Sequence, residues 1–256
     1  NGFIVETSPV LSYYDNGAQT AFVQRNGTEL QLVLLKGLAG TNNYVEMPTT
    51  LTSVAAADYR TCSAPCMLVI PFTGTDSPDS SPTYSSPYVD YTNDVIWVGD
   101  GNSRLHKFER VFRGNTPAEL VTGGFPVAVS TTGGLDLSPA VSDDTYVYIG
   151  SQSGAAAGVG GMVHRVHATT AAVTSSAKLS ADGRSGFRAP MILDVTHNRL
   201  NAFVFSRPGT ITDASLCTHT APTYVFCRAV VQFNTANFAA APITREVGLG
   251  SITGEA

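Results

Sequence analysis

The sequence predicts an all-β fold made of repeated antiparallel sheets. Three observations carry this prediction: a recurring Pro-containing segment, a β-type hydrophobic run after each copy, and no helical hydrophobic period over about ten residues. The four copies are Ser8–Ser12, Ser86–Asp90, Ser138–Ser142 and Ala189–Asp194. Their prolines are 78, 52 and 51 residues apart. A repeat of about fifty residues holding about four strands is typical of the blades of a β-propeller.

Each unit contains the same elements in the same order. The Pro-containing segment opens a strand, where proline costs no ladder hydrogen bond. An Asn/Asp/Gly/Thr turn follows, because these residues tolerate tight backbone geometry. The turns are Asp15–Gly17, Thr92–Asp94, Asp143–Thr145 and Thr196–Asn198. The next strands are expected over Thr20–Val23, Val95–Gly99, Tyr146–Gly150 and Ala202–Phe205, and the last over Leu30–Leu35, Leu105–Phe108, Val163–Val166 and Ala229–Phe233.

The run that follows the turn in each unit, such as Val95–Gly99, is apolar at consecutive rather than alternate positions. Successive strand side chains point to opposite faces, so both faces must be buried, as in a sheet packed between two other sheets. We expect units near residues 8–50, 86–135, 138–187 and 189–247, an irregular segment at 51–85, and a candidate partial unit at Met67–Phe72. The chain would form a small ring or part of a larger one. Paired β-sandwiches are the alternative, but they leave the regular spacing unexplained.

Composition limits the function classes. Charged residues make up 14% of the 256 residues and the formal net charge is −5, so the chain lacks the basic patch that nucleic-acid binding requires. No apolar run approaches the roughly twenty residues of a membrane span. The neutral polar composition, with no initiator Met and no signal peptide, indicates a mature or excised piece of a secreted protein, extracellular or periplasmic.

Four cysteines form two local pairs, Cys62 with Cys66 and Cys217 with Cys227. An even number at short spacing favours disulfides in an oxidising compartment, each worth about 2–3 kcal/mol. A zinc site using His219 beside Cys217 is the alternative.

The repeat resembles the PQQ-like repeat of quinoprotein-type propellers and of secreted bacterial proteins without assigned function. The resemblance covers about residues 8–35 and 86–235 and is best at Ser86–Phe108 and Ser138–Val166. It implies propeller blades. Quinoprotein dehydrogenases add a tryptophan motif, calcium ligands and, in some members, adjacent cysteines. Here Trp97 is the single tryptophan and no cysteines are adjacent, so PQQ is not expected, no cofactor is predicted, and calcium stays open.

Several side chains near the unit starts are candidates for a binding site. Asp90, Asp136 and Asp194 are carboxylates suited to calcium or to glycoside hydrolysis, although turn capping is the competing interpretation. Arg184 and Arg188 can hold a carboxylate or a sugar at the mouth of a ring, or remain solvated. His106 and His164 occupy equivalent positions in two units, which favours a structural role.

Tyrosines also gather near the unit starts: Tyr13, Tyr14, Tyr84, Tyr88 and Tyr91. Exposed tyrosines suit a glycan- or protein-binding face, although core packing explains some of them equally well. No nucleophile elbow or phosphate-binding loop is present. We therefore expect an extracellular binding or scaffold protein with a glycan or protein partner. The alternatives are a secreted hydrolase or lyase acting on a sugar or lactone, and a structural subunit of an extracellular assembly.

Overall fold

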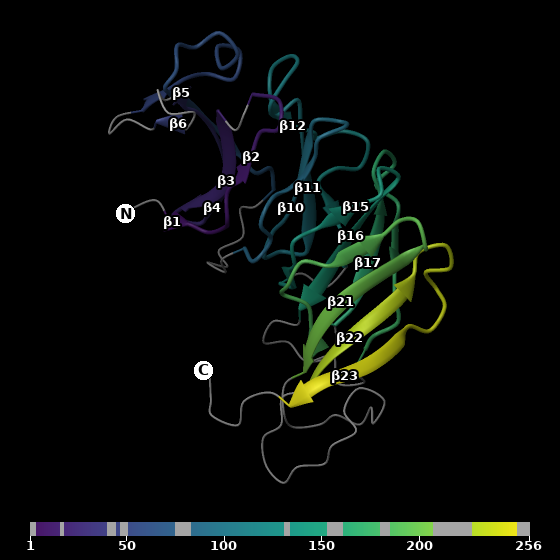
Figure 1. Ribbon diagram of the computed structural model, residues 1–256. Helices are drawn as coiled ribbons and strands as arrows, with labels where there is room; N and C mark the ends of the chain where they lie inside the picture. The colour runs from purple at the N-terminus through teal and green to yellow at the C-terminus, as the bar shows by residue number, and fades with distance from the viewer. Residues whose placement is uncertain are drawn as a thin grey trace.

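The computed structural model describes residues 4–15, 18–39, 45–46, 51–74, 83–130, 134–152, 161–179, 185–206 and 227–249. These residues form β-strands, turns and loops and contain no helix, so the all-β prediction is confirmed. Four sheets, antiparallel except for the pair β7–β8 in the first, follow one another along an arc, in the order of the chain (Figure 1). Among the described strands, no pairing joins the fourth sheet back to the first.

The first sheet has the order β1-β3-β4-β8-β7, with β2 paired to β3. Its strands are β1 (Ile4–Val5), β2 (Val10–Leu11), β3 (Gln19–Asn26), β4 (Glu29–Lys36), β7 (Thr52–Ser53) and β8 (Cys66–Pro71), while β5 (Leu38–Ala39) and β6 (Val45–Glu46) pair with each other. Met67–Phe72 is therefore not a partial unit of its own. Strand β8 belongs to the first sheet and lies beside β4, where Val69 pairs with Val33. A long connection separates the two strands in the sequence, so no local pattern indicates their pairing.

The other three sheets have five strands each and a common plan. The second contains β9 (Tyr88–Asp90), β10 (Val95–Gly99), β11 (Arg104–Glu109), β12 (Ala118–Glu119) and β13 (Val127–Ala128). The third contains β14 (Asp136–Leu137), β15 (Val141–Ser142), β16 (Tyr146–Gln152), β17 (Val163–His167) and β18 (Val173–Ser175). The fourth contains β19 (Ser185–Gly186), β20 (Ile192–Asp194), β21 (Arg199–Ser206), β22 (Cys227–Asn234) and β23 (Ile243–Leu249).

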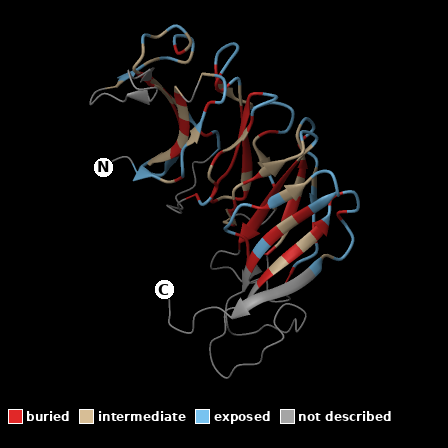
Figure 2. Ribbon diagram, viewed as in Figure 1, coloured by how far each residue is buried: buried red, intermediate tan, exposed pale blue. Residues whose placement is uncertain are grey.

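The core consists of three apolar layers, each between two consecutive sheets. In β10, Ile96 and Val98 pack toward the first sheet, while Val95 and Trp97 pack toward the third. In β16, Tyr148 packs toward the fourth sheet. Figure 2 shows the buried residues along these central strands and the exposed ones at the turns.

The prediction of burial on both faces is confirmed for Val95–Gly99 and Tyr146–Gly150. It is wrong for Ala202–Phe205, where Phe203 is 45% exposed, and in Thr20–Val23 only alternate residues are fully buried, because among the described strands the first and fourth sheets each have a neighbouring sheet on one face only. Each fully buried large side chain contributes about 1.5–3 kcal/mol.

Two glycines allow neighbouring sheets to approach each other closely. A Cβ on Gly99 would lie 2.5 Å from the Cβ of Leu137 on the third sheet. A Cβ on Gly150 would lie 2.5 Å from the Cβ of Phe187, next to the fourth sheet. Gly99 is the last residue of β10 and Gly150 is the matching repeat position in β16, so the same repeat position serves as the contact point in two consecutive layers.

Hydrogen bonds also join consecutive sheets in a repeated way. Lys107 Nζ on β11 donates to the carbonyl of Ala168, 3.3 Å away, just beyond β17. Arg165 Nη1 on β17 donates to the carbonyl of Thr235, 3.1 Å away, just beyond β22. Each side chain therefore reaches from one sheet to the end of the equivalent strand of the next, which fixes the register between the sheets.

Candidate functional site

Two of the predicted carboxylates cap turns. Asp90 accepts hydrogen bonds from the backbone N–H and the side-chain amide of Asn93, at 3.0 and 2.7 Å. Asp194 accepts from the backbone N–H of His197 at 3.1 Å and contacts its Nδ1 at 2.7 Å. The hydrogen bond from the His197 side chain lowers the pKa of Asp194. Both carboxylates therefore satisfy turn backbone, and no group of three potential ligands able to hold a metal occurs among the described residues.

The remaining predicted site residues have other bonding partners. The half-buried Tyr88 donates its hydroxyl to the carbonyl of Ser142 on the third sheet, at 3.4 Å, and burial raises its pKa. Arg188 bonds Gln152 through its Nε and lies over the ring of Tyr84, 4.6 Å from the centroid. Asp136 pairs with the same Gln152 across β14 and β16. Arg184 lies outside the described residues.

The Cys62–Cys66 disulfide is present. It links the end of a turn at residues 56–62 to the first residue of β8. Cys217 lies outside the described residues, and so does the side chain of Cys227. The second predicted disulfide therefore stays a prediction.

His106 lies between two carboxylates that the sequence analysis did not connect with it. Its Nδ1 is 2.6 Å from Glu119 Oε1 and its Nε2 is 3.3 Å from Asp100 Oδ2, and all three side chains are at most 4% exposed. Burial alone would lower the pKa of the imidazole, but the hydrogen bonds and charges of Asp100 and Glu119 outweigh burial and raise it. Glu119 also accepts the backbone N–H of Thr73 at 2.7 Å, so the cluster joins the first two sheets.

His164 occupies the corresponding position on the third sheet and has neutral partners. Its Nδ1 is 2.8 Å from the hydroxyl of Ser175 and its Nε2 is 3.0 Å from that of Ser151. Burial lowers the pKa of this imidazole to about 4. One repeat position thus holds a histidine that favours its charged form in one sheet and its neutral form in the next. Both are buried, which excludes direct contact with a ligand in this structure.

Exposed tyrosines from the first two sheets converge at one end of those sheets. We call Tyr13, Tyr14, Tyr91 and Arg113 the tyrosine platform. The three tyrosines are 77, 43 and 37% exposed, and the ring centroid of Tyr13 lies 5.9 Å from that of Tyr14 and 6.0 Å from that of Tyr91. The Arg113 guanidinium covers the ring of Tyr14 at 4.3 Å. Of the tyrosines predicted to gather, the structure brings these three together and places Tyr84 and Tyr88 elsewhere.

The platform is held in place by its own polar groups. The Tyr14 hydroxyl donates to the carbonyl of Tyr91, and the Tyr91 hydroxyl donates to the carbonyl of Leu11 at 2.6 Å. Arg113 Nη2 donates to the carbonyl of Thr92 at 2.7 Å. Burial, followed by the charge of Tyr14, raises the pKa of Tyr91, so this hydroxyl remains a donor at neutral pH. The rings of Tyr14 and Tyr91 are thus fixed before any partner arrives, which lowers the entropy cost of binding.

The buried carboxylate of Asp94 fixes the backbone that carries Arg113 of the tyrosine platform. Its two carboxylate oxygens accept the backbone N–H groups of Phe112 and Arg113, at 2.9 and 3.0 Å. The sequence indicated Asp94 only as a turn residue, and it gave no signal for Arg113. Both act through contacts between the β9–β10 turn and the segment after β11.

Comparison with protein-family models and with curated proteins found no match to this chain. The part of the chain that the structure describes contains no helix of the length and hydrophobicity needed to cross a membrane.

Proposed function

We propose that this chain is an extracellular binding module built from β-propeller blades, and that the tyrosine platform is the surface that binds a protein partner. The observation that carries the proposal is a cluster of exposed aromatic rings in which Tyr14 and Tyr91 are fixed by hydrogen bonds and Tyr13 packs against both. Soluble proteins normally bury rings of this size, and Tyr and Arg dominate the energetics of protein–protein interfaces.

The hydrogen bonding of the platform favours a polypeptide over a glycan. A sugar needs directional donors and acceptors beside the ring that it stacks on. In the platform, the hydroxyls of Tyr14 and Tyr91 and an Nη of Arg113 are already bonded to backbone carbonyls. The exposed part of the platform is therefore mainly ring surface. It lies next to Leu11, which is 56% exposed. Such a surface gains most from burying apolar side chains or proline.

The propeller architecture and the location are parts of the same proposal. The resemblance to PQQ-like repeats and the three equivalent sheet-on-sheet layers support blades. The Cys62–Cys66 disulfide supports an oxidising, extracellular or periplasmic compartment. The proposed binding requires neither PQQ nor another cofactor, because the platform acts through surface contact.

A random-peptide display library panned against the immobilised chain tests the proposal. Affinities of the selected peptides are then measured by fluorescence anisotropy for the wild-type chain and for Tyr13→Ala. Because Tyr13 is the most exposed ring, we expect its removal to weaken binding about tenfold or more, as for an interface hot spot.

Tyr84→Ala is the matched control. Tyr84 is also exposed and also lies beneath an arginine, but it is not part of the platform. We expect this variant to bind the peptides as wild type does. Selected peptides that bind Tyr13→Ala with unchanged affinity, or a glycan array that yields Tyr13-dependent ligands where the peptide library yields none, would overturn the proposal.

A further inference from the structure

We propose that the turn closed by the Cys62–Cys66 disulfide positions the tyrosine platform, and that reduction of this disulfide by a thiol weakens binding there. This inference rests on the proposed function and adds a means of regulation to it. A continuous set of contacts leads from the disulfide to Arg113.

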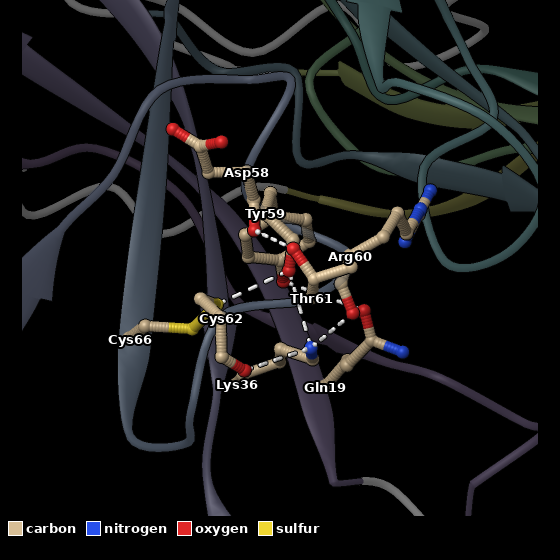
Figure 3. Close-up of a disulfide and its surroundings, with 8 residues drawn as sticks. All are labelled: Gln19, Lys36, Asp58, Tyr59, Arg60, Thr61, Cys62 and Cys66. Atoms are coloured by element: carbon tan, nitrogen blue, oxygen red, sulfur yellow. Dashed lines mark hydrogen bonds between the residues drawn. A yellow bond between two sulfur atoms is a disulfide. The ribbon is translucent and has the colours of Figure 1, made fainter.

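The first contacts tie the turn to the first sheet. Lys36 Nζ on β4 donates to the carbonyls of Tyr59, Arg60 and Cys62, at 3.1, 3.0 and 3.4 Å (Figure 3). The backbone N–H of Cys62 donates to the carbonyl of Asp58 at 2.9 Å. Burial, followed by the charge of Arg60, lowers the pKa of Lys36. Through these hydrogen bonds the Lys36 ammonium holds three carbonyls of one turn, and the disulfide links the end of that turn to β8.

The next contacts lead from the turn to the second sheet. Arg60 donates through Nε to the carbonyl of Asn115 at 3.1 Å, and through Nη2 to the carbonyl of Arg113 at 3.0 Å and to that of Arg110. One guanidinium thus collects three carbonyls from the segment that carries Arg113. A charged donor shared by three acceptors is among the stronger hydrogen-bonded arrangements on a protein surface.

A second connection runs through the ring next to Arg60. The buried Tyr59 donates its hydroxyl to Gln19 Oε1 at 3.4 Å, and Gln19 Nε2 donates to the carbonyl of Phe112 at 3.1 Å. The Arg60 guanidinium lies 5.6 Å from the centre of the Tyr59 ring. Both routes from the turn therefore end on the segment 110–115, directly beneath the platform.

The redox step involves only the disulfide and a thiol reductant. One thiolate of a dithiol attacks one sulfur of the Cys62–Cys66 bond, forms a mixed disulfide with that cysteine and releases the other cysteine as a thiolate. The second dithiol sulfur then attacks the dithiol sulfur of the mixed disulfide and releases the remaining cysteine thiolate, so the products after protonation are two cysteine thiols and the cyclic oxidised dithiol. β8 stays paired with β4, because that ladder does not depend on the disulfide. The turn loses its covalent link to β8 and keeps only the hydrogen bonds from Lys36, so the backbone that carries Arg60 is less firmly held. Arg113 then samples other positions, and Tyr14 loses the guanidinium that covers it.

The test measures the positioning effect and the binding effect separately. Hydrogen exchange at the amides of residues 110–115 is followed with and without dithiothreitol, with mass spectrometry to verify reduction. The peptides selected by display are the binding probe. We expect exchange over 110–115 to become at least about fivefold faster on reduction and peptide affinity to fall by a similar factor, with exchange over β16 unchanged.

Three variants isolate the cause. The double variant Cys62→Ser and Cys66→Ser should behave like the reduced chain and should not respond to dithiothreitol, which removes any contribution from other cysteines. Arg60→Met should give the same faster exchange with the disulfide intact. Arg25→Met, which removes an ion pair with Glu6 elsewhere on the first sheet, is the matched control and should leave exchange over 110–115 unchanged.

The outcomes separate the two proposals. Faster exchange over 110–115 without any peptide that binds the platform supports the positioning role and contradicts the proposed function. Verified reduction with unchanged exchange and unchanged affinity overturns the redox inference and leaves the proposed function standing.

Discussion

The pair of equivalent histidines allows a quantitative prediction about stability against pH. His164 is fully buried between two serine hydroxyls, and its pKa falls from the usual 6.5 to about 4. In the unfolded chain the imidazole takes up a proton below about pH 6.5. The folded chain resists that proton until about pH 4. The contribution of His164 to the free energy of unfolding is therefore complete above about pH 6.5 and is lost progressively as the pH falls to about 4.

The size of the effect follows from the difference in pKa. About 2.5 units at about 1.4 kcal/mol per unit correspond to about 3 kcal/mol. Many carboxylates also titrate in this range, so the pH dependence of the wild type alone does not isolate His164. His164→Gln keeps a polar side chain between the two serines and removes the titration.

The assay is urea unfolding at several pH values between about 7.5 and 4, for wild type and His164→Gln. Between these limits the wild type should lose about 3 kcal/mol more than the variant. Parallel curves with a constant offset would refute the assignment of a buried, neutral His164.

Three other substitutions have defined outcomes. Gly150→Ala places a methyl group against Phe187 and should destabilise the fold by about 1–3 kcal/mol in urea unfolding, and an unchanged midpoint would contradict the close approach of the two sheets. His106→Gln removes the cation between two buried carboxylates and should cost about 3–5 kcal/mol near neutral pH. Because the folded pKa of His106 is raised, its contribution is complete below pH 6.5 and fades as the pH rises, so a wild-type-to-variant gap that widens in alkali would exclude this account. Lys107→Met loses the bond to the carbonyl of Ala168 while keeping the apolar stem, so thermal unfolding should show a cost of about 1 kcal/mol, and a cost above about 3 kcal/mol would point to a different role.

Most of the sheet architecture could be predicted from the sequence, because a buried strand appears there as a local run of apolar residues. The run Val95–Gly99 is apolar at every position, and burial of both its faces follows directly. Turn capping was the competing interpretation of the binding candidates Asp90 and Asp194, and it is the one that the structure shows, since each side chain caps a backbone N–H only three residues away. The place of β8 beside β4 has no such local signal, because their pairing depends on a long intervening connection.

The platform was only partly predictable. Tyrosines near the unit starts indicated a binding face, but five were named and the structure brings three together. The deciding contacts join residues distant in sequence, such as Arg113 over Tyr14 and Arg60 to the carbonyl of Arg113. Contacts of this kind depend on how two sheets pack, and the periodicity of the sequence gives no signal for them. The Asp100–His106–Glu119 cluster lies within the second sheet, and it was missed because its side chains meet only through the pairing of neighbouring strands.

The most direct test of the central claim is ¹⁹F NMR of the chain labelled with 3-fluorotyrosine at its 10 tyrosines, titrated with a peptide selected by display. Assignment by single Tyr→Phe substitutions identifies each resonance. The account predicts that Tyr13, Tyr14 and Tyr91 shift together and saturate with one affinity, while the buried Tyr59 and Tyr148 stay unchanged. A saturable shift at Tyr84 with the platform resonances unmoved would place the binding surface elsewhere and contradict the account.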